Sequence, residues 1–226
     1  MTKFCNHIEA PLRRHDLVFV SQHGWRAMIE VRDDLASDPL IARWAGEGWP
    51  TIRRRALPDE TSGLPLGLPL PPSAGKRRVS LLSEQDDVVS VARPPSLDHA
   101  MTCAPQLWCA TLYGLVELSN RHAIDVRVFG SLAWRTLTGL NYVTDRSDLD
   151  LLFDIRPGTD LDLLTAELAA LETAAPMRLD GELMREDGPA VNWREFHDGT
   201  PQVLAKNLNG IALVDRYCFA SGRSLS

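Results

Sequence analysis

The chain has 226 residues, of which 44% are hydrophobic and 24% charged, so it is long enough for one large or two modest globular domains. Its net charge is −6, and the acidity belongs to residues 101–226, because the first 100 residues carry equal numbers of acidic and basic side chains. This balance argues against nucleic acid as a partner, since a duplex-binding protein usually presents a broad basic surface.

No apolar run reaches the roughly 20 residues that span a bilayer. The N-terminus also lacks the apolar centre of a signal peptide. We therefore expect a cytoplasmic protein with no membrane partner. The four cysteines show no Cys-x-x-Cys spacing, which indicates neither a zinc site nor a redox pair.

Residues 1–94 predict a small α/β domain. Apolar residues 17–20 predict a strand, residues 25–31 a second strand that pairs with it, and the segment after Asp38 a short helix. Residues 51–57 predict a strand or loop that carries the basic stripe Arg53-Arg54-Arg55. Residues 79–82 and 88–92 predict two strands that pair across a turn.

A Pro/Gly-rich segment, residues 58–75, interrupts this domain and ends in Lys76, Arg77 and Arg78. Prolines at 58, 65, 69, 71 and 72 exclude a regular helix and argue against a central strand. Two interpretations stay open. The segment is either a solvated linker or a loop that closes over an anionic ligand, in which case the three basic residues bind substrate.

Pro94-Pro95 predicts a domain boundary, with the second domain at residues 95–226. Apolar spacing predicts helices at 105–120 and 160–174. Strands are predicted at residues 125–129, 148–154, 177–184, 191–196 and 211–214. The expected fold of this domain is α/β, a mixed sheet with flanking helices.

Residues 126–154 carry the candidate active site. An apolar run ends in Gly130-Ser131 and is followed by a predicted helix, an arrangement in which unpaired backbone N–H groups can hold a phosphate. Asp148 and Asp150 lie two apart on the next predicted strand, so their side chains share a side.

Two carboxylates held that close repel each other unless a cation lies between them, and Mg²⁺ prefers such oxygen ligands and substrate phosphates. The segment therefore predicts phosphoryl or nucleotidyl transfer, with Asp148 and Asp150 as the magnesium ligands. A surface turn followed by solvated aspartates is the alternative for each motif alone.

Two further residues are candidates in the second domain. Asp180 and Glu182 fall on one face of the predicted strand 177–184, although Asp180-Gly181 is also a strong hairpin-turn signal. Lys206 lies between the predicted strands 191–196 and 211–214 and is a candidate phosphate ligand. A solvated surface lysine is the alternative.

Gly130-Ser131 followed by Asp148-Leu149-Asp150 resembles the signature of the nucleotidyltransferase superfamily, although the connection between Ser131 and Asp148 is longer than usual there. The segment TLTGLNYVTDRS, with RHDLVFVS, LPLGLPLPPSAGKRR, RLDGEL and VNWREF, is similar to one branch of it. That branch is the phosphoribosyl-dephospho-CoA transferases of malonate decarboxylase, also called its holo-acyl-carrier-protein synthases. The resemblance covers nearly the whole chain.

This resemblance implies a nucleotidyltransferase-like domain and a specific reaction. The substrate would be triphosphoribosyl-dephospho-CoA, and the acceptor a serine of the apo acyl-carrier subunit of malonate decarboxylase, with release of pyrophosphate. Gly130 and Ser131 would hold the leaving pyrophosphate. Asp180 would be a third carboxylate that accepts the hydroxyl proton or completes the metal site.

Two alternatives remain at this stage. One is a nucleotidyltransferase that uses an ordinary nucleoside triphosphate on a small molecule or a protein. The other is a non-enzymatic binding protein, against which the presence of both Asp148 and Asp150 argues.

Overall fold

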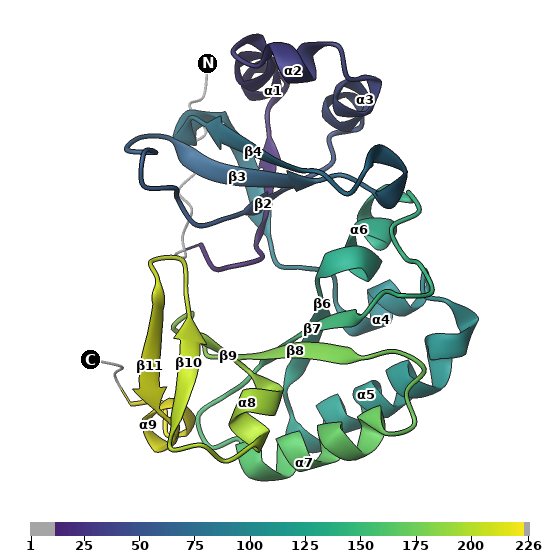
Figure 1. The fold of residues 1–226 in the computed structure, drawn as a ribbon, viewed down its shortest axis with the longest axis vertical. Helices are drawn as coiled ribbons and strands as arrows, with labels where there is room; N and C mark the ends of the chain where they lie inside the picture. Colours follow the sequence, from purple (N-terminus) through teal and green to yellow (C-terminus); the bar gives the residue numbers. More distant parts are fainter. Residues whose placement is uncertain (1–11, 224–226) are drawn as a thin grey trace, which may run out of the picture. The chain divides into compact units, whose positions relative to one another are not determined.

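The computed structural model describes residues 12–223 and contains two β-sheets, each in a compact unit, with the division between residues 93 and 94 (Figure 1). The α/β fold class expected from the sequence is confirmed, since both units contain helices and strands. No helix in the described part of the chain is long and apolar enough to cross a membrane.

The first unit is built on a five-stranded antiparallel sheet in the order β4-β3-β2-β1-β5. Three helices lie between the first and second strands in the chain and bury Trp25, Leu35 and Trp44. The elements are β1 (Leu17–Val20), α1 (Gln22–Glu30), α2 (Asp33–Ala36), α3 (Pro39–Glu47), β2 (Thr51–Arg53), β3 (Leu64–Pro69), β4 (Arg78–Ser83) and β5 (Val88–Ala92).

The strand predicted at residues 25–31 is wrong, because residues 25–30 belong to helix α1 and Val31 is its C-cap. The side chain of Ser21 accepts the N–H of Gly24 and caps the helix. Trp25 and Met28, three residues apart, form its buried side. A short apolar run cannot be assigned to helix or strand by its periodicity alone.

The Pro/Gly-rich segment contains a central strand, β3, against expectation. Its pairing with β2 is only two residues long, at Gly67 and Leu66, so few N–H groups are required on that side and Pro65 and Pro69 are tolerated. The predicted pairing of 79–82 with 88–92 is also wrong. Strand β5 pairs with β1, and β4 lies at the opposite edge of the sheet.

The second unit contains a six-stranded mixed sheet in the order β11-β10-β9-β8-β7-β6, in which only the β7–β8 pair is parallel. The strands are β6 (Asp125–Val128), β7 (Leu149–Asp154), β8 (Leu179–Met184), β9 (Ala190–Asn192), β10 (Gln202–Lys206) and β11 (Ile211–Asp215). The helices are α4 (Leu97–Met101), α5 (Cys109–His122), α6 (Gly130–Thr138), α7 (Leu161–Glu172), α8 (Trp193–His197) and α9 (Arg216–Ala220).

The two faces of this sheet differ in chemistry. On one face Leu151, Phe153 and Leu183 join the main core with side chains from α5, α7 and α8, which lie together along the sheet in Figure 1. The other face, called the polar face below, carries Asp150 and Asp180. The only apolar cluster found there among the described residues is small and consists of Leu152, Met184 and Ala190 with Phe129 packed against it. Alternation along each strand separates the two sets.

The structure corrects the predicted strand 191–196 and excludes the predicted turn at Asp180-Gly181. The predicted strand 191–196 ends at Asn192, and residues 193–197 form helix α8, while strand β10 was not predicted. Asp180 and Gly181 lie inside strand β8, so the hairpin-turn alternative is wrong. Gly181 instead permits close packing, since a Cβ there would lie 2.6 Å from the Phe153 ring and 2.9 Å from that of Trp193.

The start of β8 is fixed by a charged pair. Both carboxylate oxygens of Glu172 accept hydrogen bonds from Arg194, and Oε1 also accepts the N–H of Leu179 at 2.8 Å. Arg194 donates in turn to the Leu179 carbonyl at 2.8 Å. Burial opposes ionisation of Glu172, but the hydrogen bonds from Arg194 and Leu179 outweigh it, so the pKa of Glu172 lies below its usual value.

We predict that Glu172→Gln lowers the free energy of unfolding at neutral pH by about 1.5–3 kcal/mol, the range for hydrogen bonds to charged groups. Because the folded-state pKa is lowered, this contribution is complete above the usual value of 4.5 and is lost as the pH falls through the folded-state pKa. Urea unfolding of both proteins at neutral and at acidic pH measures the difference.

Glu117→Gln, on the exposed side of α5, is the control for removal of one carboxylate. It should leave the unfolding free energy nearly unchanged at both pH values. A destabilisation by Glu172→Gln that is equally large at neutral and acidic pH would contradict the assigned ion pair.

Candidate active site

The turn between β6 and α6 brings Gly130 against Asp150. Gly130 is the first residue of α6 and has a φ of +61°, in the left-handed region that favours glycine. A Cβ at this position would lie 2.5 Å from Cγ of Asp150. The Phe129 N–H also donates to the Asp150 carbonyl at 3.0 Å. Ser131 follows as the second residue of the helix and is half-buried.

The parallel pairing of β7 and β8 places Asp150 beside Asp180. The two residues are direct partners in the register, so their side chains emerge from the same face on strands about 4.8 Å apart. Asp148 lies immediately before β7, two residues from Asp150. All three aspartates are half-buried. The structure therefore brings Asp150, Asp180 and the Gly130 turn into one site, with Asp148 at its edge.

Asn192 is a residue of this site that the sequence reasoning missed. Its Nδ2 donates to Oδ1 of Asp180 at 3.0 Å. The register explains the contact, because Asn192 pairs with Glu182, two residues along β8 from Asp180. No sequence signal links residues 180 and 192 until the pairing of β8 with β9 is known.

The carboxylates fit magnesium as a partial ligand set. Within residues 12–223, no group of three or more His, Cys, Asp or Glu side chains is arranged to hold a metal ion. Magnesium, however, commonly takes only one or two protein carboxylates and completes its shell with waters and substrate phosphates. Asp150 with one neighbouring carboxylate, either Asp148 or Asp180, suits that use, and the predicted pair Asp148 and Asp150 stays a prediction.

Lys206 shares the polar face but lies away from the carboxylates. It is the last residue of β10 and pairs with Ala190, which pairs with Met184. Met184 is four residues along β8 from Asp180, so the usual strand dimensions put Lys206 roughly 16 Å from Asp180. The role of Lys206 as a phosphate ligand stays a prediction.

The three consecutive basic residues Lys76, Arg77 and Arg78 differ in their surroundings. Arg77 donates to Asp38 at 2.6 Å. Lys76 has a φ of +53°, and Arg78 is the first residue of β4. All three are exposed. Arg77 is thus engaged in an ion pair that fastens the segment to the start of α3.

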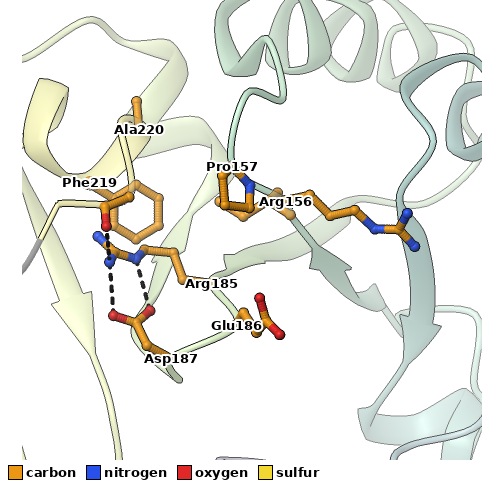
Figure 2. Close-up of a pocket in the computed structure, with 9 residues that line it drawn as sticks. Arg156, Pro157, Arg185, Glu186, Asp187, Phe219 and Ala220 are labelled. Atoms are coloured by element: carbon orange, nitrogen blue, oxygen red, sulfur yellow. Dashed lines mark hydrogen bonds and ion pairs between the residues drawn. The ribbon is translucent and has the colours of Figure 1, made fainter.

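Figure 2 shows a pocket at the other end of β7 and β8. The residues that line it include Ile155, which directly follows β7, and Arg185, which directly follows β8. Arg185 is buried and donates to both oxygens of Asp187 and to the carbonyls of Gly222 and Arg223. These bonds tie the end of β8 to the segment after α9. The pocket is separated from Asp150 and Asp180 by most of the strand length.

Comparison with known proteins identifies the chain as a transferase. The model of the phosphoribosyl-dephospho-CoA transferase MdcG N-terminal domain matches residues 13–94, and that of the C-terminal domain matches residues 96–217. The chain belongs to the phosphoribosyl-dephospho-CoA transferase family, which confirms the resemblance found in the sequence. No solved structure matches it.

Curated relatives match over nearly their full length. The phosphoribosyl-dephospho-CoA transferase of Bradyrhizobium diazoefficiens is 61% identical over 222 residues, which cover 98% of each chain. That of Xanthomonas axonopodis pv. citri is 35% identical over 213 residues, 93% of this chain and 98% of the relative.

We predict that Gly130→Ala is more damaging than Gly139→Ala. Both glycines have positive φ, +61° and +70°, so both alanine variants bear a backbone strain of about 1–2 kcal/mol. Only Gly130 would also collide with Asp150, because no atom lies within 4 Å of a Cβ at Gly139. Gly130→Ala should therefore unfold at lower urea concentration and lose transferase activity, whereas Gly139→Ala should keep it. Equal losses in the two variants would contradict the close approach.

Proposed function

We propose that this protein transfers the phosphoribosyl-dephospho-CoA group from triphosphoribosyl-dephospho-CoA to a serine of the apo acyl-carrier subunit of malonate decarboxylase. The serine oxygen bonds to the phosphorus next to the ribose, the bond from that phosphorus to the bridging oxygen breaks, and pyrophosphate leaves. The observation that supports this proposal is the placement of Asp150 beside Asp180 and against the Gly130 turn.

The turn at Gly130 and Ser131 is assigned to the leaving pyrophosphate. The first N–H groups of α6 have no partner within the helix, and the helix dipole favours negative charge at this end. Asp148 and Asp150 are assigned as the protein's magnesium ligands. When bound, magnesium would neutralise charge on the triphosphate and on the leaving group.

Asp180 is assigned to the incoming serine. A serine hydroxyl is a weak nucleophile, so a carboxylate that accepts its proton speeds the attack. Asn192 holds one oxygen of Asp180, which leaves the second oxygen for this purpose. The proton leaves the serine as its oxygen bonds to phosphorus.

Mass spectrometry of the apo carrier tests the proposal. The carrier is incubated with enzyme, magnesium and triphosphoribosyl-dephospho-CoA, and it should gain the mass of one prosthetic group while pyrophosphate appears in solution. A parallel reaction contains ATP in place of the CoA derivative. If the carrier gains no mass with the CoA derivative, the proposal is contradicted. A gain in mass with ATP alone would favour an ordinary nucleotidyltransferase.

We predict that Asp148→Asn and Asp150→Asn each reduce transfer by at least about 100-fold and leave the melting temperature nearly unchanged. Each removes a charge from the half-buried site and no core side chain, and a lost ligand weakens transition-state stabilisation by several kcal/mol. The matched control is Asp145→Asn, because Asp145 is exposed and lies in the loop that contains Asp148. This variant should transfer at the wild-type rate. Near-normal rates in the Asp148 and Asp150 variants at saturating magnesium would remove their assigned role.

We predict that the double variant Lys76→Ala/Arg78→Ala raises one KM and leaves kcat unchanged. If these residues bind the CoA derivative, the KM for that substrate rises; if they bind the carrier, the KM for the carrier rises and depends on salt. Arg77 is left intact because its replacement would also break the pair with Asp38. Two unchanged KM values would mean that Lys76 and Arg78 are solvated surface charges that bind neither substrate.

A further inference from the structure

Two hydrogen bonds fix the side-chain amide of Asn192. Its Oδ1 accepts the N–H of Arg194 at 3.0 Å and so caps helix α8. Its Nδ2 donates to Oδ1 of Asp180 at 3.0 Å. A flipped amide would lose both bonds, because a backbone N–H needs the oxygen and a carboxylate needs the nitrogen. The direction of the amide is therefore determined by its surroundings.

Asn192 and Trp193 hold strand β8 from opposite faces. Trp193 is 2% exposed, its Nε1 donates to the Leu179 carbonyl at 2.9 Å, and its ring lies close to Gly181. Asn192, one residue earlier, bonds Asp180 on the polar face. The backbone on either side of Asp180 is thus anchored at Leu179 and Gly181, and its side chain is anchored by Asn192.

The choice of asparagine at this cap needs an explanation beyond the helix. Serine, threonine and aspartate cap helices about as well, because the cap requires only an acceptor. Asparagine additionally offers a donor that reaches Asp180 while its acceptor serves Arg194. Aspartate would keep the cap but place a second carboxylate against the first.

We propose that Asn192 is a positioning residue of the transfer reaction, which holds one oxygen of Asp180 and presents the other to the reacting groups. This inference rests on the proposed function. Among residues 12–223, no donor to Oδ2 of Asp180 is found, and the neighbour in register is Asp150. Asn192 thus orients the carboxylate without adding charge to the site.

The test compares Asn192→Asp and Asn192→Ser with wild type in the carrier-transfer assay. Both variants keep a cap for α8, so both proteins should remain folded at the assay temperature. The kcat should fall at least about 10-fold in Asn192→Asp, while both KM values stay within about threefold, because Asp180 acts on the attacking hydroxyl and not on substrate binding. The serine variant should show a smaller fall in kcat.

Asn207→Asp is the matched control. Its Oδ1 accepts the N–H groups of Asn209 and Gly210, both at 2.8 Å, and an aspartate there keeps these bonds while adding the same charge to the same unit. It should retain the wild-type kcat. A wild-type kcat in Asn192→Asp, or a fall of the same size in Asn207→Asp, would overturn the proposal.

A second measurement does not depend on activity. Urea midpoints are compared for Asn192→Ser in the wild-type background and in the Asp180→Ala background. If the two side chains act as a pair, the shift caused by Asn192→Ser should fall by at least half when Asp180 is absent. Equal shifts would show that Asn192 only caps the helix. If wild type modifies no carrier, the proposed function fails, while this cycle still decides whether Asn192 holds Asp180.

Discussion

The parallel pairing of β7 with β8 is the constraint on which the site depends. Parallel neighbours need a crossover connection, and here helix α7 supplies it between the two strands. The register then makes Asp150 and Asp180 direct partners. A slip of one residue would turn Asp180 toward the apolar core and Gly181 toward the polar face. The packing that fixes this register is therefore also what assembles the carboxylates.

Two glycines allow that assembly by letting groups approach where a side chain would collide. Gly181 leaves room for Phe153 and Trp193 on the core face, which sets β8 against α8. Gly130 leaves room for Asp150 at the start of α6. The pair formed by Glu172 and Arg194 then fixes the backbone of Leu179 directly before Asp180. Core packing and site geometry are thus coupled through a few residues of β8.

Much of the second unit could be predicted from the sequence. Its clearest signals are local: the apolar run that ends in Gly130, the long apolar face of α5, and two aspartates at the start of a buried strand. Asn192 could not be found this way, because its contact with Asp180 depends on the register between β8 and β9. The boundary between β9 and α8 was missed because Asn192 ends the strand and caps the helix at once.

The first unit was harder to predict because its segments are short and their partners distant in the chain. Residues 25–31 carry an apolar pattern that suits either helix or strand, and tertiary packing of Trp25 decides for the helix. Strand β3 contains prolines that argue against a central position, and only the two-residue pairing with β2 makes that position tolerable. Neither decision can be made from local sequence.

The central claim is that Asp150, held beside Asp180 and the Gly130 turn, is a ligand of a divalent cation in this family's transfer reaction. Titration with Mn²⁺, followed by the electron paramagnetic resonance signal of the free ion, tests it without any substrate. We predict that the wild-type protein and Asp145→Asn bind Mn²⁺ alike and that Asp150→Asn binds it at least about 10-fold more weakly. Unchanged binding by Asp150→Asn would contradict this assignment.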